Sequence, residues 1–328
     1  MAAEHRQRKG SLAFRPRKRS RTQNPRILAW PKRKESKLLG FAGYKAGMTQ
    51  VTMIDMREGS QTFKQEIVVP VTIVECPPLF VFGLRAYRSG LCEEVLFDVF
   101  SDPSSWNKEM RRAISLPKKL KHTVDELEKN KEKISDVYLL AATLPSSAGF
   151  GKKKPDIVEL AIGGDVSQKI EYGKSLLGKQ VRVSDVFKAG EFVDAISVSK
   201  GKGWQGAIKR FGVKRQRRKA TGRVRHVGTL GPWHPAKVMY TARMAGQTGY
   251  HKRTIANIQI VEIGNDGKRV TPKGGFVNYG LVKSDYILLK GSVTGPKKRL
   301  IKLRASLIKE KPTPVSVRQI LTASQQGM

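Results

Sequence analysis

Short runs rich in β-branched and other apolar residues dominate the chain from Lys37 onward. Runs of this length and composition are typical of β-strands. They lie at residues 49–54, 66–75, 79–87, 136–143, 156–162, 181–183, 192–198, 257–263, 286–293 and 299–303. The pattern predicts a mainly β protein. The last two runs, joined through Gly295-Pro296, are expected to pair as a hairpin.

Helical signals interrupt the strands in two places. In residues 104–134, Ser104 or Ser105 is expected to cap a helix that stops before Pro117, and Thr123 with Glu126 fits a capping box for a second helix. A further helix is predicted over residues 166–177. We therefore expect a mainly helical insertion packed beside the sheet.

Basic residues are concentrated in two segments. The chain has 63 Lys and Arg against 27 Asp and Glu, which gives a net charge of +36. Residues 1–34 carry a net charge of +11, and residues 195–261 hold 15 basic residues and no acidic one. Because so large a charge needs neutralisation from outside the protein, a polyanion is the expected partner.

Neither basic segment has the composition to fold alone. Residues 1–34 contain three prolines, and nine glycines lie between Gly201 and Gly249. Ordering the second segment would cost on the order of 70–130 kcal/mol of conformational entropy, which a partner must offset. Aromatic residues interleaved with its charges suit RNA, whose bases stack on rings. They are Trp204, Phe211, Trp233, Tyr240 and Tyr250. The alternative is a solvated, disordered tail, and this alternative is stronger for residues 1–34.

Several other classes of protein fit the sequence poorly. The longest apolar stretch, residues 67–84, is broken by three prolines and contains Glu75, so it reads as strands and not as a membrane-spanning helix. Residues 1–34 lack the apolar core of a signal peptide, which favours the cytosol. The two cysteines, Cys76 and Cys92, are expected to be buried, reduced thiols.

Motifs for catalysis or metal binding fail on their surroundings. Residues 201–206 match GxGxxG, but no acidic residue follows before Glu262, whereas a dinucleotide site needs one about 20 positions on. His226, His234 and His251 have no Cys, Asp or Glu near them, which argues against both a metal site and acid–base catalysis. Contacts with RNA or with the local backbone are the expected roles of these histidines.

Trp233 lies in a segment with the composition of a tight turn. Gly228, Gly231, Pro232 and Pro235 surround it. Such a turn would present the indole at a loop tip, where it needs a partner surface. The alternative is a tryptophan that packs back on the β-domain.

Four blocks of sequence resemble the archaeal and eukaryotic form of the large-subunit ribosomal protein L three family. They are FAGYKAGMT at 41–49, VSKGKGWQG at 198–206 with IKR at 208–210, GPWHP at 231–235 with AGQTGYH at 245–251, and GGFVNYG at 274–280 with KRL at 298–300. The resemblance extends in order over residues 9–305. Chain length favours the archaeal form.

The resemblance implies a mainly β fold with α insertions: a six-stranded translation-protein-type β-barrel with an inserted α+β subdomain and long extended RNA-binding segments. The implied boundaries are 1–36 for a basic N-terminal extension, 37–103 and 151–199 for the first two parts of the barrel, 104–150 for the mainly helical insertion, 200–255 for a long basic loop or finger, 256–310 for the closing strands and 311–328 for a C-terminal tail.

The function implied is that of a non-enzymatic structural constituent of the large ribosomal subunit, in the cytoplasm, without cofactor, metal, membrane or small-molecule substrate. Its implied partners are large-subunit ribosomal RNA and neighbouring ribosomal proteins, and its implied roles are early subunit assembly and a finger directed toward the peptidyl-transferase centre, with Trp233 at the tip. The candidate RNA-binding residues are Arg15, Arg17, Lys18, Arg19, Lys45, Lys200, Lys202, Trp204, Lys209, Arg210, Lys214, Arg215, Arg217, Arg218, Arg223, Arg225, His226, Trp233, His234, Arg243, Gln247, His251, Lys252 and Arg253.

One position departs from the family, and two other functions remain open. Thr221 occupies the place of a histidine that is modified in eukaryotic relatives, so no modification is carried over. An RNA-modifying enzyme would need a polar catalytic cluster, which the sequence does not offer. A general nucleic-acid compaction protein would rarely combine basic extensions with so elaborate a β-domain.

Overall fold

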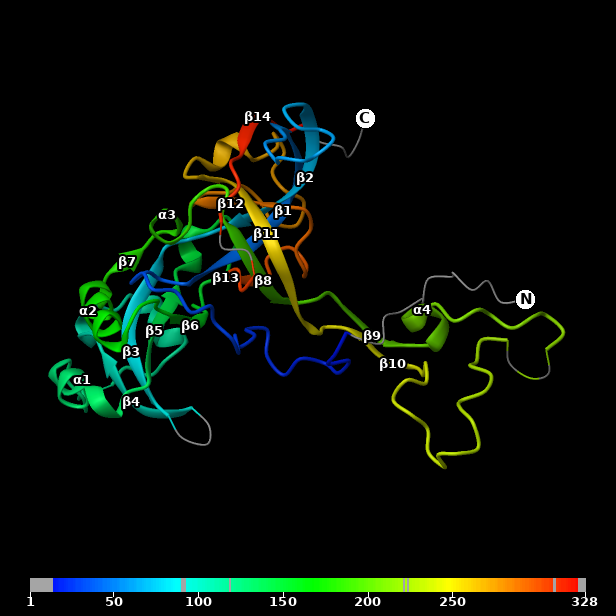
Figure 1. Ribbon diagram of the computed structural model, residues 1–328, viewed down its shortest axis with the longest axis horizontal. Helices are drawn as coiled ribbons and strands as arrows, with labels where there is room; N and C mark the ends of the chain where they lie inside the picture. Colours follow the sequence, from blue (N-terminus) through cyan, green and yellow to red (C-terminus); the bar gives the residue numbers. More distant parts are fainter. Residues whose placement is uncertain are drawn as a thin grey trace. The chain divides into compact units, whose positions relative to one another are not determined.

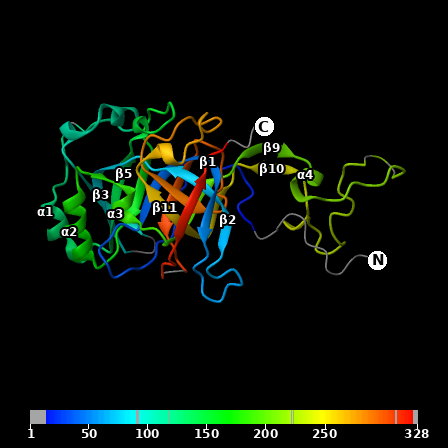
Figure 2. The ribbon, with the colours of Figure 1, turned by 90° about the horizontal axis from the view of Figure 1, so that it is seen from above.

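The chain forms two compact units. The computed structural model describes residues 14–89, 93–117, 119–220, 222, 224–308 and 311–323. Unit 1 consists of Met1–Thr22 and Val198–Arg253, and unit 2 consists of Gln23–Ser197 and Thr254–Met328. Unit 2 holds most of the strands, whereas unit 1 holds one short strand pair and one short helix (Figures 1 and 2). The protein is mainly β, as predicted.

A seven-stranded sheet forms the larger part of unit 2. Its strands follow the order β13-β8-β11-β12-β2-β1-β14, and β13 pairs also with β1. Their bounds are β1 Gly40–Ile54, β2 Glu66–Glu75, β8 Phe192–Val198, β11 Lys252–Gly264, β12 Tyr286–Lys290, β13 Leu300–Ala305 and β14 Ser316–Leu321. Because β8 and β11 are neighbours, the basic segment between them is a long excursion from one sheet, as the sequence predicted.

A five-stranded sheet forms the other part of unit 2. Strands β4, β3, β5 and β6 lie in that order, and β7 pairs with β3. Their bounds are β3 Leu79–Arg88, β4 Glu94–Phe100, β5 Asp136–Thr143, β6 Ile157–Ala161 and β7 Gln180–Val181. The helices of this unit are α1 Asp125–Lys129, α2 Val166–Leu176 and α3 Val183–Val186. The predicted helix at 166–177 is thus confirmed as α2, which begins at a capping box on Asp165.

The predicted hairpin between residues 286–293 and 299–303 is wrong. Strand β12 pairs with β11 and β2, whereas β13 pairs with β8 and β1. The loop between them crosses to the other strands and is held there by Lys45, whose Nζ donates to the carbonyls of Val293 (2.6 Å) and Gly295 (3.3 Å). Ser197 Oγ donates to the carbonyl of Thr294 at 2.7 Å. These contacts between distant parts of the chain override the local turn signal.

The first predicted helix of residues 104–134 is not formed. Two 3₁₀ turns, Pro103–Ser105 and Lys108–Arg112, take its place. The side chains of Asp102 and Asn107 accept hydrogen bonds from the amides two residues further on, and these local bonds compete with a continuous α-helix. In the second predicted helix only the five-residue α1 is α-helical, followed by the 3₁₀ turn Lys131–Lys133.

A bulge in β3 distributes its side chains between two apolar clusters. Val81 packs in the main core, which is continuous from one sheet of unit 2 to the other, while Phe82 packs in a second cluster with Trp106 and Met110. The pairing register of β3 with β5 shifts between Val81 and Gly83. Leu84 therefore returns to the main core, although strict alternation would turn it to the opposite face.

A buried ion pair joins two strands of the larger sheet. Asp194 on β8 lies opposite Arg304 on β13, and Arg304 Nη2 donates to Asp194 Oδ2 at 2.6 Å. Their side chains are only 1% and 8% exposed. The amide of Asn257 donates to Asp194 Oδ1, and Arg304 Nη1 donates to the carbonyl of Ala29. Each charge therefore has a second polar contact, as buried ions require.

Replacing Asp194 by Ala should destabilise the protein by about 3–5 kcal/mol, because it leaves the Arg304 charge buried without its partner. Urea unfolding measures this change. The matched control is Glu94→Ala, which removes an ion pair with Arg88 whose side chains are more than half exposed and should cost less than about 1 kcal/mol. Equal losses in the two variants would contradict a special role for the buried pair.

Candidate nucleic-acid interface

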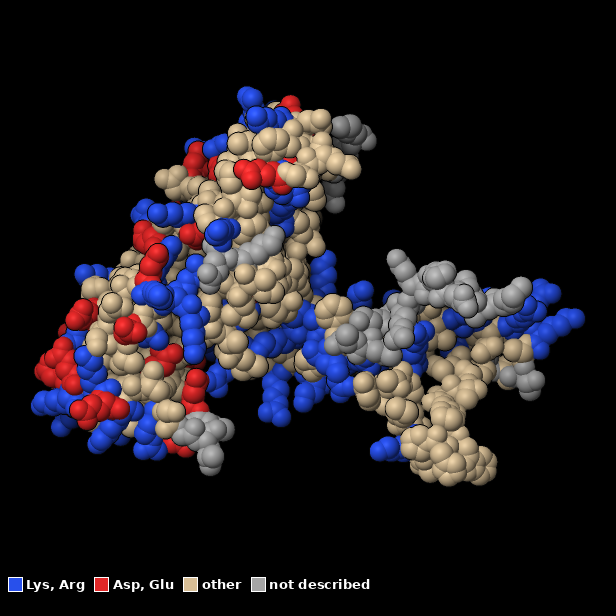
Figure 3. All heavy atoms as spheres, in the orientation of Figure 1, with Lys and Arg blue, Asp and Glu red and all other residues tan. Residues whose placement is uncertain are grey.

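Unit 1 carries a strong excess of positive charge. Its residues 14–22 and 198–253 contain 20 Lys and Arg and no Asp or Glu. In Figure 3 the charged side chains visible on unit 1 are Lys and Arg, with uncharged residues between them, whereas basic and acidic side chains are mixed on unit 2. No carboxylate in these two ranges would therefore repel an anionic partner.

A short strand pair forms the base of the long basic segment, which we call the stem. Strand β9 (Gly201–Gln205) pairs antiparallel with β10 (Gly246–Gly249). Beside this pair, the amide of Ser199 donates to the carbonyl of His251 (2.9 Å), and the amide of Tyr250 donates to that of Lys200 (3.1 Å). The sequence analysis missed both strands because their glycine-rich composition lacks the β-branched signal.

Gly249 allows the close approach of the two sides of the stem. Its φ of +73° is in the left-handed region, and a Cβ there would lie 1.9 Å from the carbonyl oxygen of Lys200. A side chain at this position would therefore be strained and would also clash with the backbone.

Helix α4 (Ala207–Phe211) follows β9 and buries two apolar side chains of unit 1. Ala207 and Phe211 are buried, while the residues between them are more exposed. The helix ends at Gly212, whose φ of +66° is the left-handed conformation usual after a helix.

The N-terminal segment lies along the stem through main-chain contacts. The amide of Ser20 donates to the carbonyl of Tyr250 at 2.8 Å. His251 Nδ1 donates to the carbonyl of Lys18 at 3.0 Å, and Arg253 Nη1 donates to the carbonyl of Pro16 at 3.0 Å. Residues 16–20 are thus held through their main-chain atoms, so these three hydrogen bonds do not depend on the side chains of this segment.

Alternate arginines of the same segment stack on aromatic rings. The guanidinium carbon of Arg15 lies 4.9 Å from the centre of the Tyr240 ring. Arg17 lies 5.2 Å from that of Phe211, and Arg19 lies 5.6 Å from that of Tyr250. Positions 15, 17 and 19 share one face of an extended chain, so the R-x-R-x-R spacing matches this arrangement.

Sequence analysis missed this use of the aromatic residues. It treated Phe211, Tyr240 and Tyr250 as stacking platforms for bases, whereas in the structure each lies against an arginine. The alternation of arginines at 15, 17 and 19 was the available signal. This alternation does not reveal which residues the arginines contact, because the aromatic residues are more than 190 positions away in sequence.

Burial and like charges lower the pKa values of several cationic groups in unit 1. Burial lowers the pKa of Arg210 and of Arg253, and the nearby charge of Arg17 lowers both further. Burial also lowers the pKa of His251, as do the charges of Arg253 and Arg210, while its bond to the carbonyl of Lys18 acts in the opposite direction. These cations thus lie close together, and residues 14–22 and 198–253 contain no Asp or Glu.

The rest of the basic segment extends away from α4 without regular structure. The described residues between α4 and β10 form only turns and bends, and all residues from 231 to 240 are exposed. Trp233 is 87% exposed, so it does not pack within unit 1. Trp204 on β9 is 75% exposed. Both indoles present ring faces that are available to a partner.

The structure brings nearly all of the predicted RNA-binding residues into unit 1. The exposed ones are Arg15, Lys18, Arg19, Lys200, Lys202, Trp204, Lys209, Lys214, Arg215, Arg217, Arg218, Arg225, His226, Trp233 and His234. The half-buried ones are Arg17, Arg210, Arg243, Gln247, His251, Lys252 and Arg253. Lys45 is buried in unit 2, and Arg223 and Thr221 lie outside the described residues, as does Cys92.

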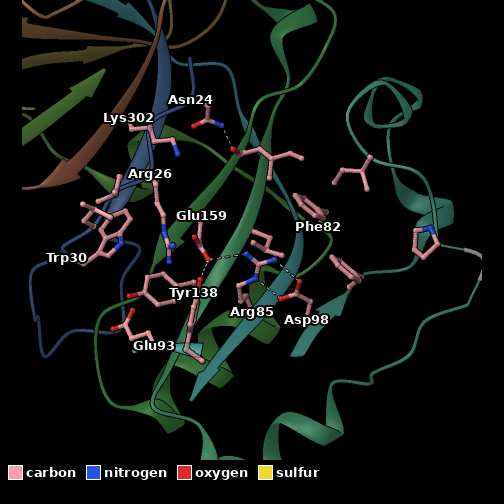
Figure 4. Close-up of a pocket in the computed structure, with 18 of the residues that line it drawn as sticks. Asn24, Arg26, Trp30, Phe82, Arg85, Glu93, Asp98, Tyr138, Glu159 and Lys302 are labelled. Atoms are coloured by element: carbon pink, nitrogen blue, oxygen red, sulfur yellow. Dashed lines mark hydrogen bonds and ion pairs between the residues drawn. The ribbon is translucent and has the colours of Figure 1, made fainter. Parts of the chain in front are cut away.

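A cavity in unit 2 is the strongest rival site. It has a volume of about 840 Å³, and aromatic side chains such as Phe82 and Tyr138 line it (Figure 4). Arg85 donates to both oxygens of Asp98 at 2.7 and 2.8 Å and to Glu159 at 3.4 Å. No Cys or His is among its described lining residues.

Three charged groups of this cavity, Arg85, Asp98 and Glu159, are paired with one another. Tyr87 donates a hydrogen bond to Glu159, and burial together with this carboxylate raises the pKa of Tyr87 to about 12. The cavity therefore holds paired charges and no nucleophile beside a general base.

Glu75 is a second carboxylate that could suggest catalysis, since it is fully buried in unit 2. Its oxygens accept hydrogen bonds from the amides of Gly149, Lys283 and Ser284 and from the hydroxyl of Tyr279. Burial and the Glu75 charge raise the pKa of Tyr279. Four donors fix this carboxylate, which ties β2 to two loops as a structural group.

The described ranges contain neither a metal-binding cluster nor a membrane-spanning helix. No three His, Cys, Asp or Glu side chains there lie close enough to hold a metal ion. No helix in the same ranges has the length and apolar character needed to cross a membrane.

Comparison with known proteins gave matches over essentially the whole chain. The family model described as Ribosomal protein L3 matches residues 1–327. Large ribosomal subunit protein uL3 of Methanosphaera stadtmanae is 45% identical over 340 residues, with 100% of both chains covered. The proteins of the same name from Methanocaldococcus jannaschii (45% over 335 residues, 98% of both chains) and Methanothermobacter thermautotrophicus (44% over 342 residues, 100% of both chains) are similar to this chain as well.

Replacing Gly249 by Ala should open the stem. The left-handed backbone alone would cost about 1–2 kcal/mol, and the contact with the Lys200 carbonyl adds to this. We expect faster hydrogen exchange of the Tyr250 amide, which donates to that carbonyl. Gly203→Ala is the matched control, because Gly203 has a φ of +67° but no atom within 4 Å of its would-be Cβ. If the Tyr250 amide exchanges equally fast in both variants, the close approach of Gly249 to the Lys200 carbonyl is not the reason for a glycine at this position.

Proposed function

This chain belongs to the ribosomal protein L3 family, and from that premise we propose that unit 1 is the surface by which it binds large-subunit ribosomal RNA. The observation that carries the proposal is the charge of residues 14–22 and 198–253, with 20 Lys and Arg and no acidic residue. A surface of this kind suits a phosphate backbone, since each phosphate neutralised by Lys or Arg releases counterions and strengthens binding.

The family predicted from the sequence is confirmed, and with it the general function. The protein is a structural constituent of the large ribosomal subunit and not an enzyme. It acts in the ribosome, in the cytoplasm, with large-subunit ribosomal RNA and neighbouring ribosomal proteins as partners.

We further infer that six strands of unit 2 form a barrel of the translation-protein type. The pairing of β13 with both β8 and β1 supports this, because the path β13-β8-β11-β12-β2-β1 then returns to its start. In this proposal the five-stranded sheet belongs to the inserted subdomain. Residues 1–36 are the basic extension, 200–255 the finger, 256–310 the closing strands and 311–328 the C-terminal tail. The insertion is then wider than the predicted 104–150, because the five-stranded sheet also takes strands from 79–100 and 157–181, which the sequence assigned to the barrel.

The finger is inferred to extend toward the peptidyl-transferase centre, with Trp233 at its tip. The exposure of all residues from 231 to 240 and the lack of acidic residues around them support insertion into RNA. A role in early subunit assembly fits the same features, because extended basic segments gain their order from RNA contacts. Peptide-bond chemistry in the particle would remain with RNA, and Trp233 would act by position.

Sedimentation of native large subunits in rising salt tests this function. An integral constituent should remain with the particle, because many phosphate contacts, protein contacts and inserted segments hold it together. A compaction protein or a transient RNA-modifying enzyme should dissociate, because its affinity depends steeply on salt. Quantitative loss of the protein from intact subunits at moderate salt would contradict the proposal.

Replacing Trp233 by Ala should remove about 1–3 kcal/mol of stacking at the fingertip. Stability in urea should stay within about 0.5 kcal/mol of the wild-type value, since the residue is a surface site. Subunits should still assemble, and the defect should appear in how the peptidyl-transferase region binds transfer RNA. Lys237→Ala, at another exposed position of the same segment, is the control. An identical transfer-RNA defect in both variants would assign the effect to charge and not to the indole.

A further inference from the structure

A tight turn between β12 and β13 carries two lysines on unit 2. The amide of Arg299 donates to the carbonyl of Pro296 at 3.3 Å, so Lys297 and Lys298 are the central residues of a β-turn. Lys298 is exposed and Lys297 is half-buried. Within the described part of the chain, neither ammonium group is paired with a carboxylate.

Lys298 has a backbone conformation that lysine rarely adopts. Its φ is +68°, and a β-turn with a positive φ at its third residue usually has glycine or asparagine there. Elsewhere the chain mostly follows this rule, with glycines and with Asn257 and Asn278 at positive φ. Either of these residue types would relieve the strain at position 298. Backbone strain of this kind is typical of positions whose side chain serves a function.

Strand β1 fixes the turn through the main chain and the side chain of Lys45. The amide of Lys298 donates to the carbonyl of Lys45 at 2.8 Å, and the amide of Lys45 donates to the carbonyl of Arg299 at 3.0 Å. The buried Nζ of Lys45 donates to the carbonyls of Val293 (2.6 Å) and Gly295 (3.3 Å). Lys45 is thus a positioning residue, and the turn is attached to the sheet before a partner binds.

The charge around the turn favours an anionic partner. Residues 286–308 contain six Lys and Arg and no Asp or Glu. Large-subunit ribosomal RNA, the partner of this family, presents phosphates at regular intervals, and a lysine ammonium group binds a phosphate as a point charge. The turn therefore has the features of a phosphate contact: fixed position, exposed charge and a strained residue that is a lysine.

We propose that Lys297 and Lys298 form an RNA contact on unit 2, in which the turn presents both ammonium groups to the phosphodiester backbone. The proposal rests on the proposed function, because it takes RNA as the partner, and it adds a site outside unit 1. In this account the strain at Lys298 persists because glycine or asparagine there would lose a phosphate contact. An acidic segment of a neighbouring protein is the alternative anion, and it predicts no change in RNA binding.

Lys298→Asn tests the site in the full chain. We would measure the Kd for a transcript of the large-subunit ribosomal RNA over a range of salt concentrations. Each lost phosphate contact removes roughly 0.7–0.9 from the slope of log K against log salt, so this variant should lower the slope by about that amount. Lys298→Asn combined with Lys297→Gln should lower it by about 1.4–1.8. The urea midpoint of Lys298→Asn should equal or exceed that of the wild type, because asparagine adopts the left-handed backbone more readily.

Lys64→Asn is the matched control. Lys64 is another exposed lysine of unit 2 with a left-handed backbone, at a φ of +62°. Its surroundings differ, because its ammonium group lies 5.3 Å from the centre of the Phe63 ring and Asp55 and Glu58 are close in sequence. Lys64→Asn should therefore relieve the same kind of strain and leave the slope unchanged.

Three outcomes would overturn the proposal. The slope and the Kd of the double variant equal those of the wild type, which would favour an acidic protein segment as the partner. Lys64→Asn lowers the slope as much as Lys298→Asn does, so that the turn has no special role. Lys298→Asn lowers the urea midpoint markedly, so that the lysine serves the fold. A wild-type chain that does not bind the transcript at all would instead overturn the proposed function, so the two failures are distinguishable.

Discussion

Repulsion among the cations of unit 1 is the constraint on which the rest depends. Residues 14–22 and 198–253 contain no carboxylate, so every contact that compacts them brings positive charges together. In the described part of unit 1, aromatic rings lie against several of these cations, as Phe211 does against Arg17 and Arg210 and as Tyr250 does against Arg19. Such contacts are individually weak. The arrangement of the unit is therefore best matched to a partner that supplies the missing negative charge, and a phosphate backbone does so at regular intervals.

Unit 2 solves the opposite problem, since its buried charges are compensated internally. Asp194 and Arg304 pair across two strands, and Glu75 accepts hydrogen bonds from three amides and a hydroxyl. These groups join β-strands and loops that are far apart in sequence. Under the proposed function, stability thus resides in unit 2 and RNA binding mainly in unit 1. A substitution can consequently change RNA affinity without unfolding the protein, or unfold the protein without touching the RNA-binding surface.

The sequence predicted what local composition controls. The β-branched runs at 66–75, 136–143 and 192–198 coincide with β2, β5 and β8, because burial on a pleated sheet favours such side chains. Features set by distant contacts were not predictable. The hairpin at 286–303 failed because Lys45 and Ser197 hold the intervening loop across the sheet. Likewise, the candidate site was found from its charge, but the sequence could not predict that residues 16–20 dock on the stem. The alternation of arginines at 15, 17 and 19 was a local signal, but it did not identify the rings against which they lie.

The central claim is that RNA contacts this protein mainly through unit 1. Ultraviolet cross-linking of native large subunits, followed by mass spectrometry of peptide–nucleotide adducts, tests it most directly. The account predicts adducts concentrated in peptides from residues 14–22 and 198–253, including the peptides that carry Trp204 and Trp233. Adducts concentrated on the mixed-charge surface of unit 2, with few or none in those two segments, would contradict it.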